Sequence, residues 1–223
     1  MAWLENVSGN CPFSWCFVPA VGQSGGLLSG INTDFYDILD SEKGCHHIRF
    51  LVRDRKNGEK LNIVNVYGAS HNKDKEYFLV ELVHICNSNT FPIIVGGDFN
   101  IIRKRGESNR NKPLNKWSTL FNAIIENWKI KEVELNGRVF TWSNNQENPV
   151  FEKLDRILMS LSHESLFPLM ILRALPRVLS DHAPLLLDSG MNLPKIVRPF
   201  KFELCWFLRE DLDTLVYNVW CDA

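Results

Sequence analysis

The sequence has no basic residue before Lys43, although this first stretch contains five acidic residues. Over all 223 residues, 25 Lys and Arg stand against 26 Asp and Glu, so the formal net charge is -1. A chain without a large positive charge is not held to nucleic acid by bulk attraction. Any binding of phosphate must therefore be local.

Long apolar runs are also absent. The longest candidate, Leu166 to Leu175, contains Pro168 and Arg173, whereas a membrane span needs about 18 consecutive apolar residues. The N-terminus lacks a basic segment followed by an uninterrupted apolar one, so no signal peptide is predicted. We expect an intracellular protein, nuclear or cytoplasmic, without a membrane partner.

No Cys-x-x-Cys pair occurs among the six cysteines, and without a secretory signal we expect free thiols. The run Cys45-His46-His47 could suggest a soft-metal site. Adjacent residues on a strand point to opposite faces, however, so we predict a buried Cys45 and exposed histidines there.

Apolar patterning predicts an α/β protein. Alternating or β-branched runs indicate strands, and apolar residues three and four apart indicate helices. The predicted strands are 48–52, 61–67, 92–95, 139–142, 156–159 and 185–187, and the predicted helices are 79–86 and 117–128. A chain of this length buries a core of its own, and helices that alternate with strands favour a layered sandwich.

Five short motifs gather polar side chains beside predicted strands. In chain order they are Val66–Ala69 (VYGA), Gly96–Asn100 (GGDFN), Phe140–Ser143 (FTWS), Leu154–Arg156 (LDR) and Ser180–Pro184 (SDHAP).

The glycines before Asp98 allow a tight turn, after which Asp98 and Asn100 can point into one cleft. A carboxylate and a carboxamide suit a hard cation and its water. Taken alone, a Gly-Gly-Asp turn that caps the next segment explains this motif equally well. His182 can act as an acid or a base, and Asp155 could orient its imidazole.

The order and combination of these motifs resemble the endonuclease/exonuclease/phosphatase (DNase I-like) superfamily. More narrowly, they are similar to the endonuclease domain of plant-type LINE (non-LTR) retrotransposons, which share a stretch like Val18–Gly22 and Ser24–Gly26. The resemblance implies a four-layer sandwich of two β-sheets flanked by helices. It also implies Mg²⁺-dependent hydrolysis of DNA phosphodiester bonds.

The resemblance implies a catalytic role for five residues. Asp98 would align or deprotonate the attacking water, and Asn100 would hold the phosphate or metal environment. His182 would stabilise the pentavalent phosphorane and be oriented by Asp155. Tyr67 would contact the phosphate.

Metal and substrate contacts follow from the same resemblance. Asp181 would assist the metal or the water, and Thr141 would contact the phosphate. Arg103 and Arg105 begin a basic cluster directly after Asn100 and could meet the DNA backbone. A solvated basic loop is the alternative for this cluster.

Two motifs of the resembled family are missing from the sequence: an opening strand with an Asn, and a strand ending in Gln-Glu whose Glu is the main metal ligand. We therefore expect residues 1–188 to form a domain truncated at its N-terminus, without its opening strands and catalytically weak or inactive. Residues 189–223 resemble a linker to a reverse transcriptase, through Arg198–Glu203 and Trp206. A non-catalytic remnant of a mobile element and a phosphomonoesterase remain alternatives.

Overall fold

In the computed structural model, the described residues are 9, 11–20, 25–88, 90–110, 113–178, 180–190, 211, 212, 214 and 217. The chain divides into two compact units, residues 1–191 and 192–223. The linker motif at 198–206 lies outside the described residues. All helices and strands named below belong to the first unit.

A six-stranded sheet forms the centre of the first unit. Its strands, in spatial order, are β3 (Tyr36–Lys43), β4 (His47–Asp54), β5 (Lys60–Tyr67), β6 (Ile93–Asp98), β11 (Asp155–Ser160) and β7 (Ile130–Glu132). β5 and β6 run parallel, and the other neighbours are antiparallel. The C-terminal ends of β5 and β6 therefore meet the start of β11 at one edge of the sheet.

Shorter sheets accompany the central one. They pair β1 (Phe13–Val18) with β2 (Leu27–Asn32), β9 (Trp142–Ser143) with β10 (Phe151–Glu152), and β12 (Ile171–Ala174) with both β13 (Leu185–Asp188) and β8 (Leu135–Asn136).

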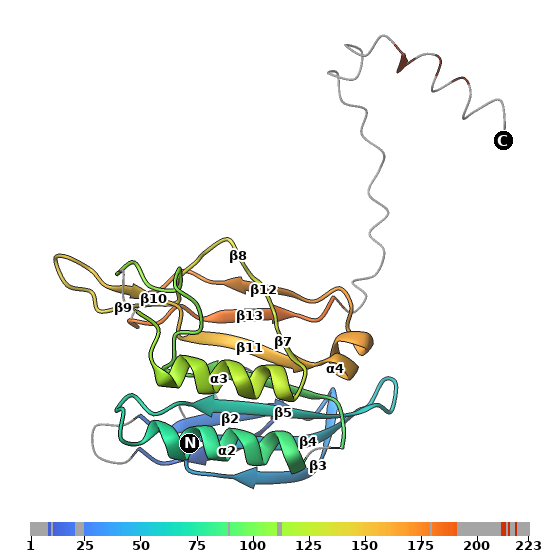
Figure 1. Ribbon diagram of the computed structural model, residues 1–223. Helices are drawn as coiled ribbons and strands as arrows, with labels where there is room; N and C mark the ends of the chain where they lie inside the picture. Colours follow the sequence, from blue (N-terminus) through green and yellow to red (C-terminus); the bar gives the residue numbers. More distant parts are fainter. Residues whose placement is uncertain are drawn as a thin grey trace. The chain divides into compact units, whose positions relative to one another are not determined.

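Two helices, α2 (Lys75–Ser88) and α3 (Lys116–Asn127), cover one face of the central sheet (Figure 1). The side chain of Asn115 accepts hydrogen bonds from the first-turn amides of α3, which satisfies donors that have no partner within the helix. The core beneath these helices joins Phe78 and Phe121 to Val64 and Val95 of the sheet. A third, short helix, α4 (Leu161–Leu166), follows β11.

The opposite face of the sheet packs against the shorter sheets. Successive side chains of a strand alternate between faces, so Ile63, Ile94 and Ile157 point away from α2 and α3. They pack in two further cores, one with β1 and β2 and one with β8, β12 and β13. The predicted α/β sandwich of layered sheets is confirmed, with α2 and α3 covering the central sheet.

Most of the predicted strands and helices are confirmed, and two predictions are wrong. Helices 79–86 and 117–128 are confirmed as α2 and α3, to within one residue at the end of α3. Strands 48–52, 61–67, 92–95, 156–159 and 185–187 are confirmed as β4, β5, β6, β11 and β13, to within one residue at the start of β6. The strand at 139–142 is wrong, because only Trp142–Ser143 is extended and Val139 is 61% exposed. The Cys45 prediction is also wrong, since Cys45 is exposed and His47 is 2% exposed. Within the described residues, no helix has the length and apolar character to cross a membrane.

Candidate active site

Three of the sequence-predicted residues lie in one row across three neighbouring strands. Tyr67 of β5 pairs in register with Asp98 of β6, which pairs on its other side with Asp155 of β11. Residues in register share a face of the sheet, and this row lies on the face away from α2 and α3. The strand ends thus bring two carboxylates and a phenol to one edge.

The two glycines before Asp98 let β6 fit between its neighbours. A Cβ atom on Gly97, whose φ is 141°, would lie 2.1 Å from the carbonyl oxygen of Val66. A Cβ atom on Gly96 would lie 2.5 Å from Cδ1 of Ile157. The Gly97 contact is with backbone and cannot be relieved, whereas the Ile157 side chain could move away from a residue at 96. Gly97 is therefore the glycine that lets Asp98 reach the row.

Asn100 fixes the Asp98 carboxylate. Its backbone amide donates to Asp98 Oδ1 at 2.9 Å, and its side-chain Nδ2 donates to Asp98 Oδ2 and to the carbonyl oxygen of Gly68, both at 2.8 Å. Asn100 adopts a φ of 50°, a conformation that Asn tolerates better than most residues. Its role is thus first to orient Asp98.

His182 joins the row from the segment before β13. Its Nδ1 lies 2.8 Å from Oδ2 of Asp155, and its Nε2 lies 3.9 Å from Oδ2 of Asp98. An ionised carboxylate only accepts hydrogen bonds, so Nδ1 carries the proton. The predicted pairing of Asp155 with His182 is present, and Nε2 is left facing Asp98.

The site also changes the acidity of its groups. Burial, followed by the charge of Asp155, raises the pKa of Asp98 to about 6. Burial alone would lower the pKa of His182, but the hydrogen bond to Asp155 and the charges of Asp155 and Asp98 outweigh it and raise that pKa. Asp98 is therefore mostly ionised at neutral pH, and the raised pKa of His182 favours the protonated imidazole.

Donor atoms of Asp98, Asp155 and His182 lie within 4.8 Å of one another, and this is the possible metal-binding group among the described residues. Asp181 is not part of it. Its Oδ2 accepts a hydrogen bond from Nε1 of Trp142 at 2.9 Å, which is the main reason that the pKa of Asp181 is lowered.

Thr141 is placed differently from the expectation. Its side chain is 1% exposed, and its Oγ1 accepts hydrogen bonds from the amides of Leu154 and Asp155, both at 3.0 Å. The hydroxyl therefore fixes the start of β11, and with it Asp155, from behind the site.

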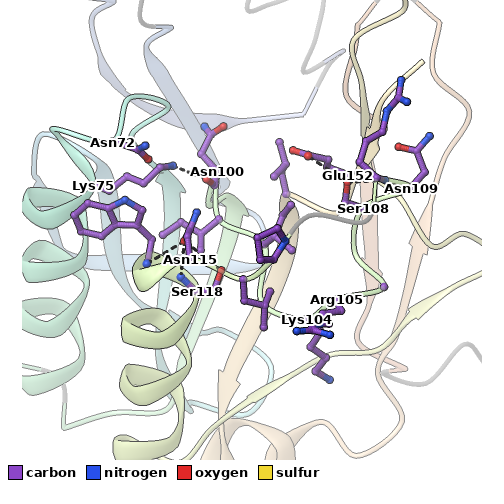
Figure 2. A pocket seen from close by; sticks show the side chains of 18 of the residues that line it. Asn72, Lys75, Asn100, Lys104, Arg105, Ser108, Asn109, Asn115, Ser118 and Glu152 are labelled. Atoms are coloured by element: carbon purple, nitrogen blue, oxygen red, sulfur yellow. Dashed lines mark hydrogen bonds between the residues drawn. The ribbon is translucent and has the colours of Figure 1, made fainter. Parts of the chain in front are cut away.

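The two arginines predicted to contact DNA lie in different environments. The Arg103 side chain is 11% exposed and forms an ion pair with Glu132 and a 2.8 Å hydrogen bond to Asn122, so it belongs to the interior rather than to a DNA-facing surface. Arg105 is exposed and lines a cavity of about 580 Å³ that also borders Asn100. Figure 2 shows Arg105 and Lys104 on one side of this cavity and Lys75 with Asn100 on another.

Sequence reasoning missed two buried cations that support the site. Lys75 donates from Nζ to the carbonyl oxygens of Ala69 and Asn100. Arg156 has no exposed side-chain surface and donates to the carbonyl oxygens of Ile101 and Lys153 while pairing with Glu107. Neither role has a sequence signal, because each depends on partners from separate elements.

Comparisons with known proteins identify the family and the fold. The sequence model of the endonuclease/exonuclease/phosphatase family matches residues 10–182. No curated protein matches the chain significantly.

Several solved structures share the fold. The endonuclease domain of TRAS1, a telomere-specific non-LTR retrotransposon, is 15% identical with a TM-score of 0.60, covering 78% of this chain and 79% of that chain. A mannosyl-6-phosphatase of Bacteroides thetaiotaomicron is 15% identical, with a TM-score of 0.54 and coverage of 84% and 80%. The human Nocturnin catalytic domain is 14% identical, with a TM-score of 0.51 and coverage of 84% and 76%.

Proposed function

The chain belongs to the endonuclease/exonuclease/phosphatase family, and on that premise we propose that it hydrolyses phosphodiester bonds of DNA at the site formed by Asp98, Asp155 and His182. The observation that carries the proposal is the hydrogen-bonded pair Asp155–His182 with Nε2 of His182 directed at Asp98. An acid, a base and an orienting carboxylate then act on one phosphate.

Each group has a distinct task in this proposal. A carboxylate with a pKa of about 6 is ionised at neutral pH yet basic enough to accept a proton from an attacking water. The His182 imidazolium, held by Asp155, offsets the charge that develops on the phosphate oxygens. Asn100 keeps Asp98 oriented while the proton moves.

The family generally requires a divalent metal, and the residues present supply part of a donor set for one. Mg²⁺ prefers oxygen ligands, and Asp98 and Asp155 supply carboxylates within the 4.8 Å group. When bound, the cation would offset the charge of the non-bridging oxygens and of the leaving alkoxide. Within the described residues, no third carboxylate joins the group, so we expect weak metal binding and slow hydrolysis, as the missing Gln-Glu strand also predicts.

A DNA substrate is favoured by the cavity beside Asn100. It is lined by the cationic side chains of Lys104, Arg105 and Arg110 and by several amides and hydroxyls. Such a lining suits successive phosphates of a strand more than one small phosphomonoester. The endonuclease domain of the TRAS1 retrotransposon, which shares the fold, supports the same substrate class.

The proposal is tested by incubating the chain with supercoiled plasmid and, in parallel, with mannose 6-phosphate. We predict conversion of plasmid to open circles that requires Mg²⁺ and stops with EDTA, and no phosphate release from the sugar phosphate. Phosphate release with intact plasmid would identify a phosphomonoesterase. Neither reaction at any Mg²⁺ concentration would contradict the proposal and favour the non-catalytic remnant.

A further inference from the structure

The outer face of α2 and α3, which lie side by side in Figure 1, exposes apolar side chains. Val80 of α2 is 62% exposed and Leu120 of α3 is 47% exposed, and Tyr77 adds an aromatic ring that is 74% exposed. A groove of about 490 Å³ runs between the two helices. Its lining includes Leu79, Val80, Val83, Leu120, Ala123 and Ile124. Apolar surface that is continuous in this way is typical of a protein–protein contact.

Two charged residues stand at the ends of α3, and each has the sign that its end of the helix disfavours. Lys116 begins α3 and Glu126 lies in its last turn. A helix carries partial positive charge at its N-terminal end and partial negative charge at its C-terminal end, so both residues are unfavourable for α3 by itself. Both side chains are exposed. In the parts of the chain that the structure describes, neither forms an ion pair.

A second copy of α3 in antiparallel orientation supplies the missing charges. When the pair is centred between Leu120 and Ala123, the larger side chain of each copy lies against the smaller one of the other. Lys116 then comes level with Glu126 of the second copy, to within about one residue's rise of 1.5 Å. It also meets the negative end of that helix. Because a twofold axis repeats every contact, the same pair forms twice.

The same twofold axis suits α2. Nε1 of Trp128 donates to Oδ1 of Asn87 at 3.1 Å, and this bond holds α2 beside α3 with Val80 next to the centre of α3. Tyr77 lies three residues before Val80 and His84 lies four residues after it, and both are exposed. On two antiparallel copies of α2, each Tyr77 ring therefore faces the imidazole of the other copy. The face is complementary to itself along both helices.

We infer that the outer face of α2 and α3 binds the same face of a second copy of this chain, which gives a twofold symmetric dimer. The face measures roughly 20 Å by 20 Å, from the lengths of the helices and their usual spacing. This area is small for a specific interface, so the dimer is weak and reversible. The row of Tyr67, Asp98 and Asp155 lies on the other face of the sheet and stays open. The inference is independent of the proposed function.

Sedimentation velocity of the full chain at low ionic strength tests the dimer over a concentration series from about 1 to 300 µM. We predict a reversible monomer–dimer equilibrium. Lys116→Glu and Glu126→Lys should each raise the dimer dissociation constant roughly tenfold or more, because each turns two attractive pairs into repulsive ones. An equimolar mixture of the two variants should regain roughly the wild-type affinity as a heterodimer, because opposite charges meet again at both pairs.

Matched control variants separate this face from the rest of the surface. Glu59→Lys, at an exposed position between β4 and β5, changes the net charge as Glu126→Lys does and should leave the equilibrium unchanged. Val80→Asn should weaken the dimer, whereas Val139→Asn, at a position that is 61% exposed elsewhere, should not. Both charge reversals suit their ends of α3, so circular dichroism should show that each variant is folded.

Three results would overturn the inference. The first is a chain that stays monomeric at every concentration. The second is a dimer whose affinity changes in neither charge reversal, because another surface would then form it. The third is a mixture of the two variants that associates no better than each variant alone, because the antiparallel arrangement of α3 would then be wrong.

Discussion

The ammonium group of Lys75 lies 2.6 Å from the carbonyl oxygen of Asn100 and 2.8 Å from that of Ala69. Lys75 begins α2 and is 6% exposed. It ties the loop after β5 to the loop after β6, and these two strands carry Tyr67 and Asp98. Burial lowers the pKa of Lys75, although the charge of Asp98 acts in the opposite direction. The first turn of α2 thus supports the acidic row.

Replacing Lys75 should destabilise the fold. Lys75→Met leaves two buried carbonyl oxygens without donors, and we predict a loss of about 1–3 kcal/mol in the free energy of unfolding. Urea denaturation measures it. The exposed neighbour Lys73 provides the control Lys73→Met, which should unfold like the wild type; equal midpoints for all three proteins would contradict the role given to Lys75.

The charge of Asp155 should set the pKa values of both Asp98 and His182. Its charge raises the pKa of Asp98 and of His182, so Asp155→Asn should lower both values. NMR titration of the metal-free protein measures them. Asp188→Asn, at the exposed end of β13, should change neither. A His182 pKa that stays or rises in Asp155→Asn would refute the pairing.

The buried imidazole of His163 should make the stability of the fold fall at acidic pH. Burial lowers its pKa from 6.5 to about 4, so the unfolded chain takes up a proton below pH 6.5 that the folded chain refuses. Stability should then fall as the pH drops from 6.5 towards 4, by roughly 3 kcal/mol from this group.

Denaturant midpoints at several pH values check the His163 contribution. His163→Leu should flatten the dependence between pH 6.5 and 4, whereas His84→Gln, at an exposed position on α2, should not. The same slope in wild type and His163→Leu would show that His163 is not the responsible group.

Arg156 is the buried cation whose loss should matter most for folding. It pairs with Glu107 at 3.2 Å and with Glu132 at 3.3 Å, and its charge is a main reason, against burial, that the pKa of Glu132 is lowered to about 2. Arg156→Met should destabilise the fold by about 3–5 kcal/mol, because it leaves buried carboxylates with fewer cations. Thermal unfolding of Arg156→Met measures this loss, and Arg173→Met, at an exposed position of β12, is the control. Equal melting temperatures for the two variants would argue against the role of the ion-pair network.

The convergence of Asp98, Asp155 and His182 could be predicted because each lies at the end or start of an apolar strand. Strand ends are readable from alternation and from glycine, and the family resemblance supplied the order in which they meet. The helices were predictable for a similar reason, since α3 shows an apolar stripe over three turns.

Other features depend on partners that alternation does not reveal. β3 is not among the predicted strands; its Asp37 and Asp40 pair with Arg53 and Arg49 of β4. Arg103 reads as part of an exposed basic loop, but Glu132, 29 positions away, draws it inside. Such ion pairs form only after the strands have been brought together, so local sequence does not encode them visibly.

The central claim is that Asp98 and His182 act together on a phosphodiester bond. Initial rates of plasmid nicking in Mg²⁺ should be compared for the wild type, Asp98→Asn and His182→Gln, with Asp188→Asn and His84→Gln as matched controls. We predict that each site variant loses about 100-fold or more in rate, while the controls nick like the wild type. Nicking at the wild-type rate in both Asp98→Asn and His182→Gln would contradict the account.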